Sequence, residues 1–255
     1  MSIGKYAIIR SVPNTYDKCI RHSHFENTIN VELAKRQHLR YCEVLQQMGL
    51  TLIPIDPDHR FPDCCFVEDP AFVIGEMAII SKMGATSRIG EEIEVEKTLS
   101  KFKKVYKIDP PGTIEGGDVL RINEKTYIGL STRTNRFAIQ QVNNVVSEYG
   151  YQVIPVEIED TLHLKSACTY LGNDSMVMSP GHFDNKVFSQ YNKIIIPKRE
   201  AHGANCLSMN GKVLIQEGYP STKKLIEDEG FETVEIEVSE FRKAGGSLTC
   251  LSIIF

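Results

Sequence analysis

Four polar, glycine-containing segments of this chain each carry a side chain that can take part in catalysis. They are RFPDCCFVEDP (60–70) with Asp69, GTIEGGDVL (112–120) with Glu115, LHLKSA (162–167) with His163, and GGSLTCLS (245–252) with Cys250. A thiolate nucleophile needs a base or a positive neighbour, and an imidazole titrates in the required range. The four segments together predict nucleophilic catalysis by Cys250 in a site rich in carboxylates.

The four reactive side chains recur at similar intervals. Asp69 to Glu115 is 46 residues, Glu115 to His163 is 48, and His163 to Cys250 is 87, close to two intervals with one position skipped. Each segment runs into an apolar, strand-like stretch. The four groups are therefore expected at comparable places in successive structural units, and they would meet at the centre if the units close into a ring.

A second feature repeats with the same spacing. Short β-type runs follow helical patterns with a drifting period of about 45 residues, which is typical of radial or solenoid repeats. Three of these runs directly follow a glycine (Gly49, Gly150 and Gly230), the residue expected just past a helix end. The pattern predicts five copies of one unit, with these runs at LTLIPI (50–55), KVYKID (104–109), YQVIPV (151–156), KIIIPK (193–198) and FETVEI (231–236).

Hairpins and one-sided helices complete each unit. Helices with one apolar face are expected in 28–48, 91–103 and 134–149. Paired strands with short Gly, Asn or Asp loops are expected in 71–82, 118–130, 168–179 and 206–216. The fifth pair is split between KYAIIR (5–10) and the C-terminal TCLSIIF, so pairing of the last strand with the first would close the ring without an exposed sheet edge. We expect a single α/β domain over 1–255.

Composition narrows the class of protein. The chain is 42% hydrophobic and 24% charged, as in ordinary soluble globular proteins. A net charge of −4 without a long basic run disfavours nucleic acid or an anionic membrane as partner. No window approaches the roughly 18 apolar residues of a membrane helix, and KYAIIR is too short for a signal peptide. The predicted compartment is the cytoplasm.

The cysteines and histidines do not indicate a metal centre. Seven cysteines are scattered without a CxxC pair, which favours neither a disulfide framework nor a zinc ribbon. His22 and His24 have no third ligand at finger-like spacing. We therefore expect no structural metal.

The polar segment 13–27 is a candidate lid over the central cavity.

Carboxylates are concentrated in two of the four segments. A guanidinium is a planar cation that carboxylates satisfy best when they arrive in its plane. The acids of these two segments are therefore candidates to bind a guanidinium. Glu68 and Asp118 could instead accept hydrogen bonds where strands begin, and for Asp118 we favour this second interpretation. The acids in question are Asp63, Glu68, Asp69, Glu115 and Asp118.

The motifs RFPD-x-x-FVEDP, GTxExGD, LHLK and GG-x-x-x-C-x-S together resemble the dimethylarginine dimethylaminohydrolase family of the guanidine-modifying, or pentein, superfamily. The resemblance extends over most of the chain, including AKRQH (34–38), GATSR (84–88) and STRTN (131–135). It implies a five-bladed, pseudo-symmetric α/β propeller of ββαβ units. It also implies hydrolysis of asymmetric dimethylarginine or monomethylarginine to citrulline plus dimethylamine or methylamine, through a covalent thiouronium on cysteine. This mechanism requires no cofactor or metal.

The resemblance also implies roles for individual residues. Cys250 would be the nucleophile, His163 the general acid and base, and Glu115 a carboxylate on the guanidinium. The implied substrate-binding residues are the acids Asp63, Glu68 and Asp69, the ring of Phe66 near the cation, Arg88 and Arg133 on the α-carboxylate, and, at looser matches, Ile20 and the backbone of Ala244.

One departure from the superfamily bears on the substrate. Arginine deiminases and amidinotransferases carry an aspartate two residues after the catalytic histidine, where it binds unsubstituted nitrogens; here Lys165 stands at that position. This favours a methylated substrate. The alternatives are an arginine deiminase or a hydrolase of another substituted guanidine or ureido amino acid, and a non-catalytic propeller like the ribosome anti-association factor, against which Cys250, His163 and Glu115 count. The expected partner is a small molecule, and a homodimer stays open.

Overall fold

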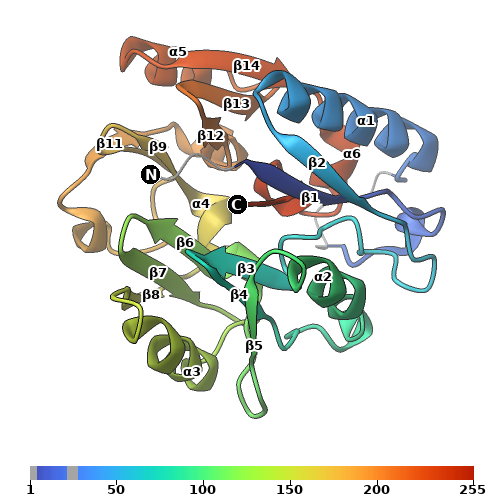
Figure 1. The fold of residues 1–255 in the computed structure, drawn as a ribbon. Helices are drawn as coiled ribbons and strands as arrows, with labels where there is room; N and C mark the ends of the chain where they lie inside the picture. The colour runs from blue at the N-terminus through green and yellow to red at the C-terminus, as the bar shows by residue number, and fades with distance from the viewer. Residues whose placement is uncertain (1–4, 22–27) are drawn as a thin grey trace.

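The computed structural model of the chain describes residues 5–21 and 28–255 (Figure 1). Within these residues the strands form five three-stranded sheets that follow one another around a ring. His22, His24 and residues 22–27 of the candidate lid lie outside the described residues.

Every sheet repeats one pattern: an inner strand pairs antiparallel with a middle strand, and the middle strand pairs parallel with an outer strand. The predicted hairpins and outer runs are confirmed in all five. From inner to outer strand, the sheets are β15 (Ile253–Ile254), β1 (Tyr6–Arg10) and β2 (Thr51–Ile55); β3 (Ala71–Ile74), β4 (Met77–Ile80) and β5 (Lys104–Lys107); β6 (Val119–Ile122), β7 (Lys125–Leu130) and β8 (Gln152–Glu157); β9 (Cys168–Gly172), β10 (Ser175–Met178) and β11 (Asn192–Ile195); and β12 (Leu207–Met209), β13 (Lys212–Gln216) and β14 (Glu232–Ile236).

A helix joins the middle to the outer strand of each unit, which confirms the ββαβ repeat. These helices are α1 (Val31–Gln47), α2 (Glu92–Leu99), α3 (Arg136–Ser147) and α5 (Pro220–Asp228), with the short 3₁₀ helix η4 (Asn185–Phe188) in the fourth unit. Shorter helices lie in the connecting segments: η1 (Tyr16–Lys18), η2 (Thr86–Arg88), η3 (Gly116–Asp118), α4 (Leu164–Ala167), η5 (Lys198–Ala204), α6 (Ser239–Lys243) and η6 (Thr249–Leu251).

Local sequence signals explain where the two longest helices begin and end. The side chain of Asn30 accepts a hydrogen bond from the Leu33 N–H at the start of α1, and Asn135 does the same for α3. Beyond their ends, Gly49 and Gly150 have φ angles of +95° and +81°, which L side chains rarely adopt. These terminal residues confirm the helix ends predicted from glycine.

The ring closes as the split hairpin predicted. Ala7 pairs with Ile254 and Ile8 with Ile253, so β15 is antiparallel to β1. The Tyr6 N–H also donates to the carbonyl of Phe255. Because Cys250 lies just before β15, this pairing fixes the predicted nucleophile to the first strand of the chain.

The hydrophobic core lies between neighbouring sheets. In the described part of the chain, five clusters of buried apolar side chains each join one unit to the next, as Ile8 and Ile80 do for the first and second units. Burial of this kind at each junction stabilises the ring as a whole. Among the described residues, no helix is both long and apolar enough to cross a membrane.

Candidate active site

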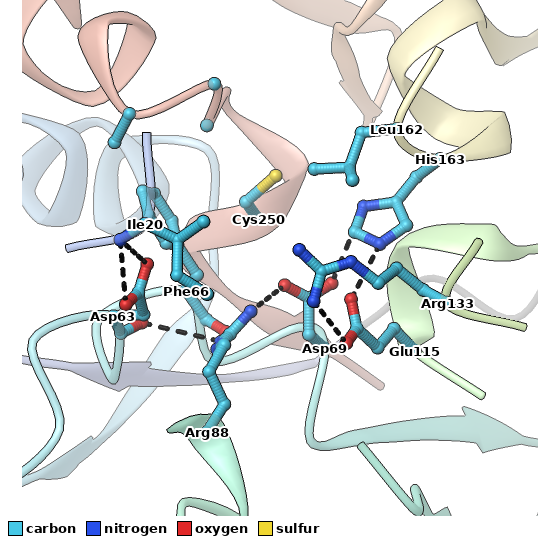
Figure 2. Close-up of a pocket in the computed structure, with 13 residues that line it drawn as sticks. Ile20, Asp63, Phe66, Asp69, Arg88, Glu115, Arg133, Leu162, His163 and Cys250 are labelled. Carbon is cyan, nitrogen blue, oxygen red and sulfur yellow. Dashed lines mark hydrogen bonds and ion pairs between the residues drawn. The ribbon is translucent and has the colours of Figure 1, made fainter. Parts of the chain in front are cut away.

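Several of the segments that precede inner strands meet in a pocket at the centre of the ring (Figure 2). Ten of the eleven predicted site residues line it; Glu68 does not. Its volume is about 30 Å³, room for a few water molecules and not for an amino acid. The lining residues are Ile20, Asp63, Phe66, Asp69, Arg88, Glu115, Arg133, Leu162, His163, Ala244, Gly245, Gly246 and Cys250.

His163 and Glu115 form a buried pair in this pocket. His163 Nε2 lies 2.9 Å from Glu115 Oε2, and Nδ1 lies 3.9 Å from Asp69 Oδ1, beyond hydrogen-bonding distance. Burial alone would lower the pKa of His163, but the carboxylates of Asp69 and Glu115 outweigh it and raise the pKa to about 9. The imidazole is therefore charged at neutral pH.

The glycine-rich segment before β6 shapes the space for this imidazole. A Cβ atom on Gly117 would lie 2.4 Å from His163 Nδ1, so the ring can pack here only against a glycine. The next residue, Asp118, accepts a hydrogen bond from the Leu164 N–H at 3.0 Å. Asp118 also accepts from the hydroxyls of Ser131 and Thr134. It acts as the structural acceptor we expected and holds the segments of His163 and Arg133 in place.

Cys250 reaches the pocket from the side opposite Glu115 and Arg133 (Figure 2). It lies in η6 and is half-buried. The Glu68 N–H donates to the Cys250 carbonyl at 3.2 Å. Burial, followed by the carboxylates of Glu68 and Asp69, raises the pKa of the Cys250 thiol. The raised pKa keeps the thiol neutral at physiological pH.

Arg88, expected on the α-carboxylate of the substrate, donates four of its five N–H groups to protein acceptors. Its Nη1 donates to Asp69 Oδ2 at 2.6 Å, while Nε and Nη2 donate to the carboxylate of Glu91, and Nη2 also donates to the Phe66 carbonyl. Burial raises the pKa of Glu91 to about 7 in spite of this partner. Burial alone would raise the pKa of Asp69, but His163 and Arg88 lower it below its usual range. Asp69 is thus a buried carboxylate held in its charged form.

Arg133 turns toward the predicted guanidinium site. Its Nη1 lies 3.6 Å from Glu115 Oε1, an ion pair drawn as a dashed line in Figure 2. Its backbone passes close to Gly84, where a Cβ atom would lie 2.7 Å from the Arg133 carbonyl oxygen. The Arg133 side chain also lines the pocket and takes up part of its space.

The opposite wall consists of Asp63, Phe66, Ile20 and the loop after α6. Both carboxylate oxygens of Asp63 lie 3.2 Å from the Ile20 nitrogen, whose N–H donates to them. Burial raises the pKa of Asp63. A Cβ atom on Gly246 would lie 2.2 Å from Phe66 Cε1, so the glycines after Ala244 let the aromatic ring approach the nucleophile loop.

Comparisons with known proteins show the family of the chain. The family profile described as "N,N dimethylarginine dimethylhydrolase, eukaryotic" matches residues 9–254. The chain belongs to the dimethylarginine dimethylaminohydrolase family. It is 36% identical over 224 residues to N(G),N(G)-dimethylarginine dimethylaminohydrolase of Pseudomonas aeruginosa, which covers 87% of this chain and 88% of the relative.

Solved structures of dimethylarginine dimethylaminohydrolase share the fold closely. A cysteine-to-serine variant of the Pseudomonas aeruginosa enzyme complexed with citrulline superimposes with a TM-score of 0.95 at 33% identity, covering 99% of this chain and 100% of that one. A histidine-to-glycine variant of a dimethylarginine dimethylaminohydrolase, an adduct with S-methyl-L-thiocitrulline, superimposes with a TM-score of 0.96 at 33% identity and the same coverage. The five-bladed propeller is thereby confirmed.

Glu68 lies behind the nucleophile in this member of the dimethylarginine dimethylaminohydrolase family. Its carboxylate pairs with Lys165 Nζ and accepts from Thr249 Oγ1 at 2.9 Å. Glu68 and Lys165 instead line a second cavity, of about 250 Å³, bordered by inner strands of the ring. Burial raises the pKa of Glu68 even with the ammonium group beside it. The ammonium group of Lys165 offsets part of this rise.

A metal ligand set can be drawn from the same residues. One donor atom each of Asp69, Glu115 and His163 lies within 4.8 Å of the others. These atoms already interact with one another and with the guanidinium groups of Arg88 and Arg133. Positive charge next to the carboxylates thus comes from the protein's own side chains.

Several lining residues were not predicted. Leu162, Gly245 and Gly246 are direct neighbours of predicted residues, so proximity in sequence was a usable signal. Glu91 does not line the pocket and belongs to no motif; only its contact with Arg88 connects it to the site.

Proposed function

We propose that this protein hydrolyses Nω-methylated arginines to citrulline and a methylamine, with Cys250 as nucleophile and His163 as general acid and base. The supporting observation is that one pocket contains a cysteine thiol, a charged imidazole paired with Glu115, and the charged carboxylate of Asp69. A planar cation bound between the carboxylates would face the thiol. Membership of the dimethylarginine dimethylaminohydrolase family supplies the substrate class.

Catalysis begins with formation of the thiolate. The bound guanidinium lowers the raised pKa of the Cys250 thiol, because a positive charge within a few Å favours the anion. Cys250 Sγ then attacks the guanidinium carbon and forms a tetrahedral adduct. That carbon is a poor electrophile because its charge is delocalised, so holding the cation in near-attack geometry carries much of the rate enhancement.

His163 serves both halves of the reaction. Its Nδ1, which faces Asp69 without a hydrogen bond, donates the proton with which dimethylamine leaves, and a thiouronium remains on Cys250. The neutral imidazole then takes a proton from water as the water oxygen attacks the same carbon. Collapse of the second adduct breaks the C–S bond and the hydroxyl proton passes to solvent, which releases neutral citrulline and leaves the Cys250 thiolate beside a reprotonated His163. One water is consumed for each dimethylamine released.

Arg133 is proposed to bind the α-carboxylate of the substrate. The pocket is too small for an amino acid as it stands, and the head group of Arg133 occupies the side near Glu115. The incoming guanidinium replaces Arg133 at Glu115, while the carboxylate offers Arg133 a new anion. Asp63 and Ile20 lie on the opposite wall, where an α-ammonium group could be held.

We also propose that the protein acts in the cytoplasm as a single catalytic domain on a small molecule. All seven cysteines are free thiols, which suits a reducing compartment.

The test is citrulline release from asymmetric dimethylarginine, monomethylarginine and arginine under identical conditions. We expect the methylated substrates to be turned over with roughly a hundredfold larger kcat/KM, a difference of ~2.7 kcal/mol. Lys165 is the reason, since it pairs with Glu68 and offers no carboxylate to unmethylated nitrogens. Equal use of arginine would favour the deiminase alternative. No citrulline from any of the three would favour the non-catalytic one.

A further inference from the structure

The position skipped between His163 and Cys250 is occupied by Asn205. It lies 42 residues after His163 and 45 before Cys250, close to the repeat interval. It also precedes the inner strand β12 by two residues, as Asp69 precedes β3. Asn205 therefore lies shortly before the inner strand of the fifth sheet, as a proposed functional side chain does in each of the other four.

The amide of Asn205 joins two catalytic segments. It is buried, with 3% of its surface exposed. Oδ1 accepts from the Thr249 N–H at 3.1 Å, while Nδ2 donates to Thr249 Oγ1 and to the Lys165 carbonyl, both at 2.9 Å. Thr249 directly precedes Cys250, and Lys165 lies two residues after His163.

We propose that Asn205 is a positioning residue that sets the nucleophile against the general acid and base. This inference rests on the proposed function of Cys250 and His163. One planar group accepts from the backbone on the cysteine side and donates to the backbone on the histidine side, so it fixes the separation of the two segments. No smaller or purely accepting side chain offers both.

Neighbouring hydrogen bonds also hold the turn that carries Cys250. Thr249 Oγ1 accepts from Asn205 and donates to Glu68, so the hydroxyl continues the chain toward the carboxylate behind Cys250. The hydroxyl of Tyr41 donates to the Leu248 carbonyl on the other side of the same turn. Reaction rates fall steeply when reacting groups are displaced by about 1 Å. Loss of the Asn205 amide should therefore reduce reactivity more than it reduces substrate binding.

The first measurement compares Asn205→Ala with the control Thr222→Val. Thr222 is also buried and lies on α5, outside the catalytic pocket. Its hydroxyl donates to the carboxylate of Glu200 at 2.9 Å. We expect Asn205→Ala to lower kcat for dimethylarginine roughly tenfold to a hundredfold per active site, with KM within about twofold of wild type. Active sites are counted by covalent trapping of Cys250. Thr222→Val should lower the melting temperature and leave kcat unchanged.

The second measurement needs no substrate. Alkylation of Cys250 by iodoacetamide, followed on its peptide by mass spectrometry, should slow in Asn205→Ala and stay at the wild-type rate in Thr222→Val. If Asn205→Ala does not fold, Asn205→Asp replaces it, because this isosteric side chain still accepts from the Thr249 N–H but cannot donate to the Lys165 carbonyl. We expect slower alkylation in this variant also.

The outcomes separate the two proposals. Wild-type kcat per active site and wild-type alkylation in the folded variant would overturn the role of Asn205 and leave the hydrolase intact. Wild-type protein that releases no citrulline, together with slower alkylation in Asn205→Ala, would overturn the proposed function and keep the link between the segments.

Discussion

Glu115 Oε2 lies 2.9 Å from His163 Nε2, and both side chains are almost completely buried. The carboxylate holds one imidazole nitrogen and leaves Nδ1 for a reacting group. Together with Asp69 it keeps the ring protonated at neutral pH. A protonated imidazole is thus present in the pocket before any substrate binds.

Replacing Glu115 should change the pH dependence of the reaction. The folded-state pKa of His163 is raised from 6.5 to about 9. The charged imidazole therefore stabilises the fold fully below pH 6.5, and this stabilisation is lost as the pH rises through 9. Glu115→Gln removes one carboxylate and should lower this pKa. We expect the alkaline limb of kcat to move to lower pH in a pH–rate profile. An unchanged limb would show that another group controls it.

Cys250→Ser should abolish turnover and leave the fold intact. The covalent step requires a thiolate, which a serine hydroxyl cannot supply here. Mass spectrometry of acid-quenched wild type should find substrate-derived mass on the peptide that contains Cys250. Cys64→Ser is the control, because Cys64 Sγ donates to the Asp58 carbonyl and a hydroxyl can do the same. An adduct on Cys64 or Cys65 would contradict the assignment.

His163→Gly should separate leaving groups. An amine must be protonated as it leaves, whereas a thiolate need not be. We expect turnover of dimethylarginine to fall far more than formation of the adduct from S-methylthiocitrulline, measured on the same protein. Equal losses with both substrates would contradict a proton-donor role.

Arg133→Ala should weaken substrate binding. Loss of a hydrogen bond to the substrate's charged carboxylate should cost ~1.5–3 kcal/mol, partly offset because Arg133 no longer has to leave Glu115. The measurement is the affinity of the Cys250→Ser protein for dimethylarginine with and without the second substitution. Arg136→Ala is the control, since this arginine is exposed on α3 and pairs with Glu157. Equal affinity in both double variants would show that the proposed substrate pose is wrong.

Arg88→Ala should act mainly on stability. Arg88 neutralises the buried carboxylates of Asp69 and Glu91, and removing one partner of a buried pair costs about 3–5 kcal/mol. Denaturant unfolding should therefore show a large loss of the free energy of unfolding, whereas Arg133→Ala should show little. Similar stability losses in the two variants would mean that the arginines do not differ in this way.

The sequence by itself determined the repeat, the closure of the ring and most of the pocket. Helix ends at Gly49 and Gly150, hairpin loops and alternating strands depend on local backbone preferences, which a sequence displays directly. Four reactive residues placed before four inner strands then had to meet at the centre, because a closed ring brings equivalent positions together.

Only the tertiary structure decided how the individual side chains pair. Glu68 was predicted in the substrate site, yet it faces Lys165, 97 residues away, on the far side of the nucleophile. Glu91 has no motif, and only its contact with Arg88 reveals it; the repeat interval marks the position of Asn205 but not its hydrogen bond with Thr249. Such pairings depend on the direction of each side chain and on the charges left unpaired by burial. Neither quantity exists until distant units of the chain are packed together.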